Sequence, residues 1–344
     1  MNSKERVDAA MHHQPVDRTP FAFVDAGAWA SQTNGKSYDE LYHLPDGGAS
    51  VFVDTLKQFE PDIVSGVNGV FTAYLNAFGC KINTTNTGSP VNTEACLKSP
   101  EDIDKLDITT VREQLLANDF VQCMLRQCEN IKKLVGDEKY VLVDIAGPFT
   151  AANVMYGTAE FMVLTMRNKA AAGKLMDFAT AASIEIFRLL REHGADIAFI
   201  AEPCASGTMI SPKMMKQFVI PGYAKLKEAV DYKYWIAHIC GGSGNRAEGL
   251  AEAGLNAFSC DYMVDLDQVF AAGQDHDLIP FGNINPAGAV MMGTPEETYE
   301  EAMAALKKAN GRSMILATGC DLASTAPAEN ILMIPKAVKD MANA

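Results

Sequence analysis

The chain has 344 residues, of which 48% are hydrophobic and 21% are charged, so it can form a large folded core. Its 43 acidic and 29 basic residues give a net charge of −14, which argues against nucleic acid or an anionic membrane surface as a partner. No apolar run approaches the roughly 18 residues of a membrane span, and the first residues lack the apolar core of a secretory signal. We therefore expect a cytoplasmic protein, in which eight cysteines are too sparse for a disulfide scaffold.

Short apolar runs alternate along the chain with stretches of helical periodicity. Two of these stretches open on helix-start signals, Ser211-Pro212 and Thr294-Pro295. The apolar runs are near-continuous, as expected of parallel strands that are buried on both faces. They number eight and span 21–25, 62–67, 140–147, 196–202, 234–240, 257–261, 279–284 and 313–320. This order predicts an α/β fold, a single (β/α)8 TIM barrel domain over 1–344, with an N-terminal helical extension and an inserted hairpin or lid around 68–139.

Polar residues stand at the end of nearly every predicted strand. In a (β/α)8 barrel the catalytic residues lie at the carboxyl ends of the strands, so these positions predict an enzyme. The residues are Asp25, Asn68, Asp144, Glu202, His238, Cys240, Asp261, Asn283, Asn285 and Cys320.

A histidine and two cysteines among these residues suggest a metal site. His238 and Cys240 are two residues apart on one strand, so both side chains point to the same side, and Cys320 ends the last strand. One nitrogen and two thiolates suit Zn²⁺, and three protein ligands leave the open fourth position of a catalytic zinc site. The alternative is a hydrogen-bonded core histidine beside small buried cysteines. A further alternative is a dinucleotide fingerprint, because residues 242–247 match G-x-G-x-x-A.

Several sequence blocks together resemble the uroporphyrinogen decarboxylase superfamily, and specifically its methyltransferase branch, which contains the methylcobamide:coenzyme M methyltransferases. The opening SKERVDAAMHHQPVDRTPF resembles the start of that superfamily. The blocks that resemble the methyltransferase branch are DIAGPFTAANVMYGTAEFM, DIAFIAEPCASGTMISPKMMKQFVIPGY, HICGG, PFGNINPAGAVMMGTPEE and GCDLASTAPAENI. The resemblance implies a zinc site formed by His238, Cys240 and Cys320 on a barrel.

The resemblance also implies methyl transfer between a zinc-activated acceptor, such as a thiol like coenzyme M, and the cobalamin of a partner corrinoid protein. The reverse reaction is the alternative, in which a methoxylated compound or methanol gives its methyl group to cob(I)alamin, and the motif does not decide the direction. Decarboxylation of a tetrapyrrole is less favoured, because residues 23–35 lack the arginine that the decarboxylases carry in this stretch.

Four further strand-end residues are candidates for the site. We expect Glu202 and Asp261 to contact zinc or substrate as catalytic groups, although Glu202 could instead be a structural acid that fixes the following loop. We expect Asp144 and Asn283 to orient the cofactor, the ligands or the substrate. The sequence assigns no role to Cys80, Cys96, Cys123 or Cys128.

Overall fold

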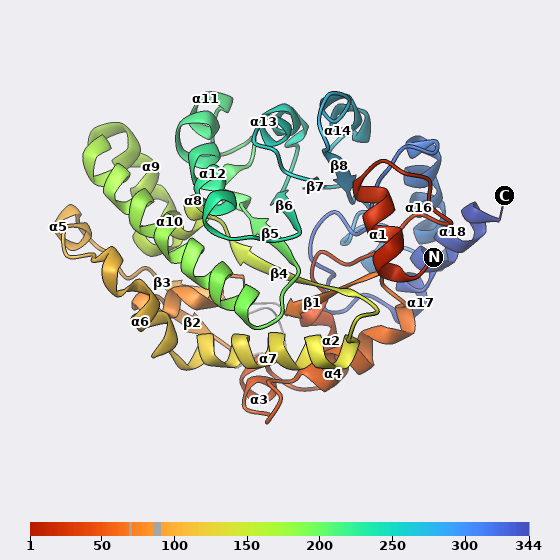
Figure 1. The fold of residues 1–344 in the computed structure, drawn as a ribbon, viewed down its shortest axis with the longest axis horizontal. Helices are drawn as coiled ribbons and strands as arrows, with labels where there is room; N and C mark the ends of the chain where they lie inside the picture. The colour runs from red at the N-terminus through yellow and green to blue at the C-terminus, as the bar shows by residue number, and fades with distance from the viewer. Residues whose placement is uncertain (69–70, 85–90, 344) are drawn as a thin grey trace.

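The computed structural model describes residues 1–68, 71–84 and 91–343, and its centre is a parallel sheet (Figure 1). Six strands pair in the order β1-β4-β5-β6-β7-β8, each parallel to the next. Their bounds are β1 Ile63–Val67, β4 Tyr140–Ala146, β5 Ile197–Ala201, β6 Tyr234–Ile239, β7 Ala257–Cys260 and β8 Ile279–Phe281. These six strands coincide with six of the eight predicted runs.

The first and eighth predicted runs complete the order without forming regular strands. Phe21 forms a parallel bridge with Leu316, and Phe281 forms one with Ile315. On the other side, the Asp62 amide donates to the Phe21 carbonyl at 2.7 Å. Prolines at 20 and 280 interrupt the pairing here because proline has no amide hydrogen to donate. The arrangement is consistent with the predicted (β/α)8 barrel, with bridges where the sequence predicts two further strands.

The strands divide their side chains between two cores. On β4, Tyr140 and Leu142 face one hydrophobic cluster, whereas Val141 and Val143 face the other, as the two-residue period of a strand requires. The smaller cluster contains residues from all eight predicted runs, so it is the core that the strands enclose. Its members on these runs are Ala22, Val24, Ile63, Tyr140, Leu142, Ile197, Phe199, Tyr234, Ile236, Ala257, Ile279, Phe281, Ile315 and Ala317. Asp144 and His238 continue the inward-facing series at the carboxyl ends of their strands.

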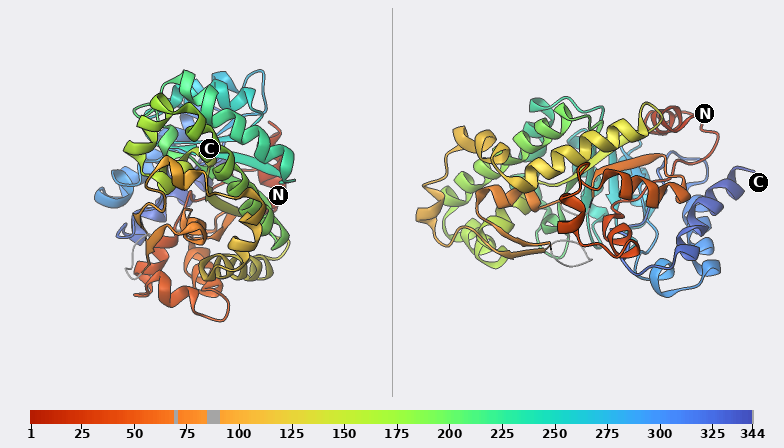
Figure 2. Two further views of the ribbon diagram at one scale, coloured as in Figure 1. Left: turned by 90° about the vertical axis from the view of Figure 1, so that its left-hand side faces the viewer. Right: turned by 90° about the horizontal axis from the view of Figure 1, so that it is seen from below.

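Helices surround the sheet, and both chain termini lie toward one end of the molecule (Figures 1 and 2). The predicted N-terminal helical extension is α1, which adds Val7, Ala10 and Met11 to the interior cluster. In the described residues no helix is both long and apolar enough to cross a membrane. The helices are α1 Ser3–Met11, α2 Gly27–Thr33, α3 Tyr38–Tyr42, α4 Ala49–Leu56, α5 Pro100–Ile103, α6 Val111–Leu116, α7 Asp119–Val135, α8 Pro148–Tyr156, α9 Thr158–Arg167, α10 Lys169–Glu192, α11 Pro212–Met214, α12 Ile220–Ala229, α13 Ala247–Glu252, α14 Leu266–Ala272, α15 Ala289–Met292, α16 Pro295–Ala309, α17 Ala328–Ile331 and α18 Met333–Ala342.

The predicted insertion at 68–139 contains an antiparallel hairpin followed by helices. The hairpin pairs β2 (Lys81–Asn83) with β3 (Val91–Glu94), and helices α5, α6 and α7 follow it. Residues 69–70 and 85–90 of the insertion lie outside the described residues. The structure thus confirms the hairpin that the sequence predicts, and α7 returns the chain to the sheet.

A buried ionic cluster joins α1 to the start of β1. The Asp62 carboxylate is fully buried and accepts hydrogen bonds from Arg6 Nη1 at 2.7 Å and from Arg18 Nη1 at 2.7 Å. It also accepts from Ser3 Oγ and from the backbone amide of Phe21, both at 2.9 Å. One carboxylate therefore ties the N-terminal helix and the first predicted run to the sheet.

Candidate metal centre

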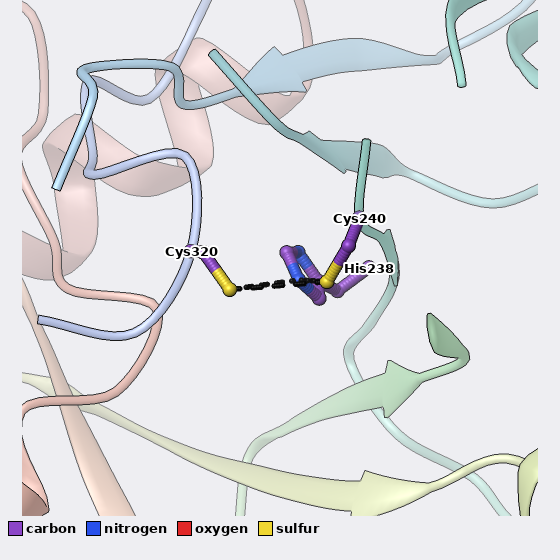
Figure 3. A group of neighbouring side chains, drawn as sticks. All are labelled: His238, Cys240 and Cys320. Carbon is purple, nitrogen blue, oxygen red and sulfur yellow. Dashed lines mark hydrogen bonds between the residues drawn. The ribbon is translucent and has the colours of Figure 1, made fainter. Parts of the chain in front are cut away.

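The side chains of His238, Cys240 and Cys320 point toward one another (Figure 3). The distance from His238 Nε2 to Cys240 Sγ is 3.1 Å, and Cys320 Sγ lies 3.8 Å from each of these two atoms. All three side chains are largely enclosed, and His238 is only 4% exposed. Residues 80 positions apart in the sequence thus form one compact group of metal-binding atoms, and in the described part of the chain no other group of histidine, cysteine and acidic side chains is drawn together in this way.

The spacing of the three atoms fits a tetrahedral zinc ion. Zinc–sulfur bonds of about 2.3 Å and zinc–nitrogen bonds of about 2.0–2.1 Å place two sulfurs about 3.8 Å apart and a nitrogen about 3.5 Å from each sulfur. The observed sulfur–sulfur separation is 3.8 Å, and the two nitrogen–sulfur separations of 3.1 and 3.8 Å bracket the expected value. The donor set and its spacing therefore suit zinc, with one coordination position left over.

The local backbone explains how His238 and Cys240 reach the same point. His238 is the fifth residue of β6, and Cys240 follows the last residue of that strand. Gly241 then adopts φ +73°, a conformation that glycine reaches without strain, and turns the chain away. The Asp261 carboxylate accepts hydrogen bonds from the amides of Gly241 and Met263, both at 3.0 Å. Asp261 thereby fixes the loop that carries Cys240.

The His238 ring is held by neighbours on both adjacent strands. Its Nδ1 lies 2.9 Å from Ser259 Oγ on β7, and its ring stacks on Phe199 of β5 with the centroids 5.7 Å apart. These contacts direct Nε2 toward the two sulfurs, as the outer partners of metal-binding histidines commonly do. Burial alone lowers the pKa of His238, but the nearby Cys320 sulfur and the Asp321 carboxyl outweigh burial and leave the pKa raised.

Three acidic residues, Asp25, Asp144 and Asp321, lie close enough to interact electrostatically near the Cys320 sulfur. Burial is the largest cause that raises the pKa of Asp144 well above its usual range, and Asp321, Asp25 and Cys320 add to it. Burial likewise raises the pKa of Asp321, with Asp25 as the next cause. Asp144 is 7% exposed, and its Oδ1 has no hydrogen-bond partner among the described residues. Several carboxyl groups buried together favour the binding of a cation nearby. Their raised pKa values also mean that they hold a proton more tightly than exposed carboxyl groups do.

Glu202 turns toward helix α8. It is fully buried, and its Oε1 accepts a hydrogen bond from the Thr150 amide in the first turn of that helix. A Cβ atom at Gly147 would lie 2.0 Å from Glu202 Oε2, so the carboxyl packs directly against the helix start. Burial is the largest influence on this carboxyl and raises its pKa from 4.5 to about 7. These contacts favour the structural interpretation of Glu202, in which it anchors α8.

The raised pKa of Glu202 predicts a pH-dependent stability. Between about pH 4.5 and 7 the unfolded chain has lost this proton while the folded chain keeps it, so the free energy of unfolding falls as the pH rises. Glu202→Gln cannot ionise and should gain about 2–3 kcal/mol relative to the original chain between pH 5 and 8. Urea denaturation of both proteins across this range measures the difference. A difference that stays constant with pH would contradict the burial of an uncharged carboxyl.

The other predicted site residues occupy distinct places. The Asn283 side-chain amide donates to the carbonyls of Asp261 at 3.2 Å and Val264 at 2.8 Å, so it braces the loop after β7. Three residues close to the candidate ligands were not predicted from the sequence, namely Ser259, Phe199 and Asp321. Ser259 could have been found from the strand order, because it pairs directly with His238 in the register of β6 and β7.

Comparisons with known proteins agree with this architecture. A family model described as uroporphyrinogen decarboxylase (URO-D) matches residues 2–341. The methylcobamide:CoM methyltransferase MtbA of Methanosarcina mazei is 26% identical over 349 aligned residues, which cover 98% of this chain and 97% of the relative. The methylcobamide:CoM methyltransferase MtaA of Methanosarcina barkeri (strain Fusaro) is 25% identical over 342 residues, with 95% of each chain covered.

A solved structure shows the same fold. The methyltransferase from Methanosarcina mazei superposes with a TM-score of 0.89 at 23% identity, with 99% of each chain covered. The family model and this fold match both extend over almost the whole chain, and they confirm the resemblance found in the sequence. The chain belongs to the uroporphyrinogen decarboxylase (URO-D) family.

Proposed function

We propose that the protein is a zinc-dependent methyltransferase that moves a methyl group from a methylated corrinoid protein to a thiol. The observation that carries the proposal is the His238–Cys240–Cys320 group, whose atoms have the spacing of a zinc site with one open position. The relatives named methylcobamide:CoM methyltransferases support the thiol direction, because coenzyme M is a thiol. No observation of the site favours the reverse direction, from a methoxylated compound to cob(I)alamin.

The proposed site assigns distinct tasks to the residues around it. His238, Cys240 and Cys320 would hold zinc, and zinc bound there would lower the pKa of a thiol that takes the fourth position. Ser259 and Phe199 fix the histidine ring, while Asp261 and Asn283 fix the loops after β6 and β7 in positioning roles. These residues set the geometry of the thiol acceptor before the methyl donor arrives.

The overall transfer releases one proton, which a carboxyl group of the chain can accept. A thiol and a methyl–cobalt(III) corrinoid give a methyl thioether, a cobalt(I) corrinoid and a proton. We assign the proton to Asp144, because its buried Oδ1 has no hydrogen-bond partner among the described residues and because burial, followed by the nearby acidic groups, raises its pKa. The sequence suggests Glu202 and Asp261 as catalytic groups. Asp261 has both carboxylate oxygens engaged by backbone amides. Glu202 accepts through Oε1 from the Thr150 amide, and its unpartnered Oε2 packs against Gly147 at the start of α8.

Removing the hydroxyl that contacts His238 should weaken metal binding without unfolding the protein. Ser259→Ala keeps the size of a fully buried side chain but deletes the partner of His238 Nδ1. We expect zinc affinity to fall about 10–100-fold, measured by competition with a chromogenic chelator. Ser183→Ala is the matched control, since Ser183 is also fully buried but contacts Tyr74 and the Ala146 carbonyl instead. An equal loss of affinity in both variants would contradict a specific role for Ser259.

The function is tested with zinc-loaded protein, methylcob(III)alamin and coenzyme M. The proposal expects the visible absorbance of the methylated corrinoid to decay and methylated coenzyme M to appear by mass spectrometry in equal amount. The same mixture with other small thiols measures the range of acceptors. Formation of methylcob(III)alamin from cob(I)alamin and a methoxylated compound, without any thiol methylation, would overturn the proposed direction.

A further inference from the structure

A second pair of cysteines lies at the base of the hairpin β2–β3, in a part of the fold that the proposed methyl transfer does not use. Cys80 directly precedes β2, and Cys96 follows β3 by two residues. Their sulfur atoms are 3.3 Å apart, and both cysteines are free thiols. We propose that Cys80 and Cys96 form a redox modification site. A small disulfide such as oxidised glutathione oxidises the pair to an internal Cys80–Cys96 disulfide.

The backbone holds the two sulfurs in place from both sides. The Cys80 amide donates to the Leu75 carbonyl at 3.3 Å, and the Cys80 carbonyl accepts from Asn76 Nδ2 at 2.9 Å. The residue after Cys96, Leu97, donates its amide to the Met155 carbonyl at the end of α8 at 2.9 Å. The antiparallel pairing of Lys81 with Glu94 connects the two sides. A disulfide bond of about 2.05 Å would require the two sulfurs, now 3.3 Å apart, to approach by only about 1.3 Å.

The two thiols differ in exposure in a way that suits a two-step exchange. Cys80 is fully buried, whereas Cys96 is partly exposed and is the sulfur that a small disulfide can reach. The hydrogen bond between the two thiols lowers the pKa of Cys80, with a smaller contribution from the positive charge of Lys98, and raises the pKa of Cys96. In the second step Cys80 is the resolving thiol because its sulfur lies 3.3 Å from the Cys96 sulfur.

Oxidation of the pair takes two thiol–disulfide exchange steps. Cys96 attacks one sulfur of the small disulfide RSSR, which forms a mixed disulfide and releases the first RSH. Cys80 then attacks the Cys96 sulfur, which forms the internal disulfide and releases the second RSH. Two electrons pass to RSSR, and the two cysteine protons leave with the two RSH molecules. The other non-metal cysteines include Cys123 and Cys128, which lie on the single helix α7 and contact Arg126 and the Leu190 carbonyl rather than each other.

Peptide mapping tests the pair directly on the full-length, zinc-loaded protein. The folded protein is incubated with oxidised glutathione, the remaining thiols are alkylated, and trypsin is added without reductant. Cleavage after Lys57, Lys81 and Lys98 places Cys80 alone in peptide 58–81 and Cys96 alone in peptide 82–98. We expect these two peptides to be recovered joined, and to separate after treatment with dithiothreitol.

Single variants separate the two steps of the exchange. Cys80→Ser should leave glutathione attached to Cys96, because the resolving thiolate is missing. Cys96→Ser should leave Cys80 unmodified, and Cys123→Ser should give the same joined peptides as the original chain. Recovery of Cys80 and Cys96 as separate alkylated peptides, or persistence of glutathione on Cys96 in the original chain, would overturn the proposal. The zinc content of the same samples is read separately, so failure of the metal site does not alter this outcome.

Discussion

Replacing Cys240 or Cys320 by serine should remove bound zinc and lower the rate of thiol methylation by at least about 100-fold, more than the loss of an outer partner causes. Each change deletes one of three protein donors, and a hydroxyl is a poor substitute for a thiolate as a zinc ligand. Two protein donors bind zinc much more weakly than the three of a catalytic zinc site. Zinc content by elemental analysis and methyl transfer from methylcob(III)alamin measure the two effects on the same samples.

A cysteine elsewhere in the chain provides the control for these variants. Cys123 lies half-buried on α7, where its sulfur contacts the Arg126 side chain, so Cys123→Ser should retain both zinc and activity. Thermal unfolding of all three proteins shows whether each variant is folded. Folded Cys240→Ser and Cys320→Ser proteins that keep one zinc per chain would place the metal elsewhere.

Replacing Asp62 by alanine should lower the free energy of unfolding by about 3 kcal/mol, because two guanidinium groups lose the fully buried carboxylate that they share. Arg6 is 6% exposed and would keep Asp17 as its only carboxylate partner, whereas Arg18 would lose the carboxylate that it bonds. The Phe21 amide would lose its acceptor as well, next to the irregular pairing of the first predicted run. Denaturation by urea at constant pH measures the loss.

An exposed ion pair on the same helix is the matched control. Lys4 on α1 lies 3.7 Å from Asp137, whose side chain is fully exposed. Water and salt screen such a pair, so Asp137→Ala should leave the unfolding curve unchanged. If Asp62→Ala were as stable as Asp137→Ala, the buried cluster would not anchor the N-terminal helix to the sheet.

Much of the fold was predictable because its physical causes are local in the sequence. Near-continuous apolar runs and helix-start signals mark the strands and helices, and the sequence predicted a hairpin or lid within the insertion. The pairing of the first and eighth runs was not predictable in detail. It depends on prolines at 20 and 280 and on contacts between segments nearly 300 residues apart, such as Phe21 with Leu316.

The candidate site shows the same division. The sequence predicted that His238, Cys240 and Cys320 could meet, because the carboxyl ends of parallel strands share one face. It could not show that Glu202 turns to the start of α8, since that depends on the absence of a side chain at Gly147. Nor could it reveal Ser259 as the partner of His238 before the neighbouring strands and their register were known.

The central claim is that the three-residue site holds zinc with a position open for a thiol acceptor. X-ray absorption at the zinc edge of the purified protein, with and without coenzyme M, tests it most directly. The account predicts two sulfur ligands and a histidine nitrogen in the free protein, and a third sulfur when the thiol is added. A sulfur count that stays at two with saturating thiol, or a zinc ion without sulfur ligands, would contradict it.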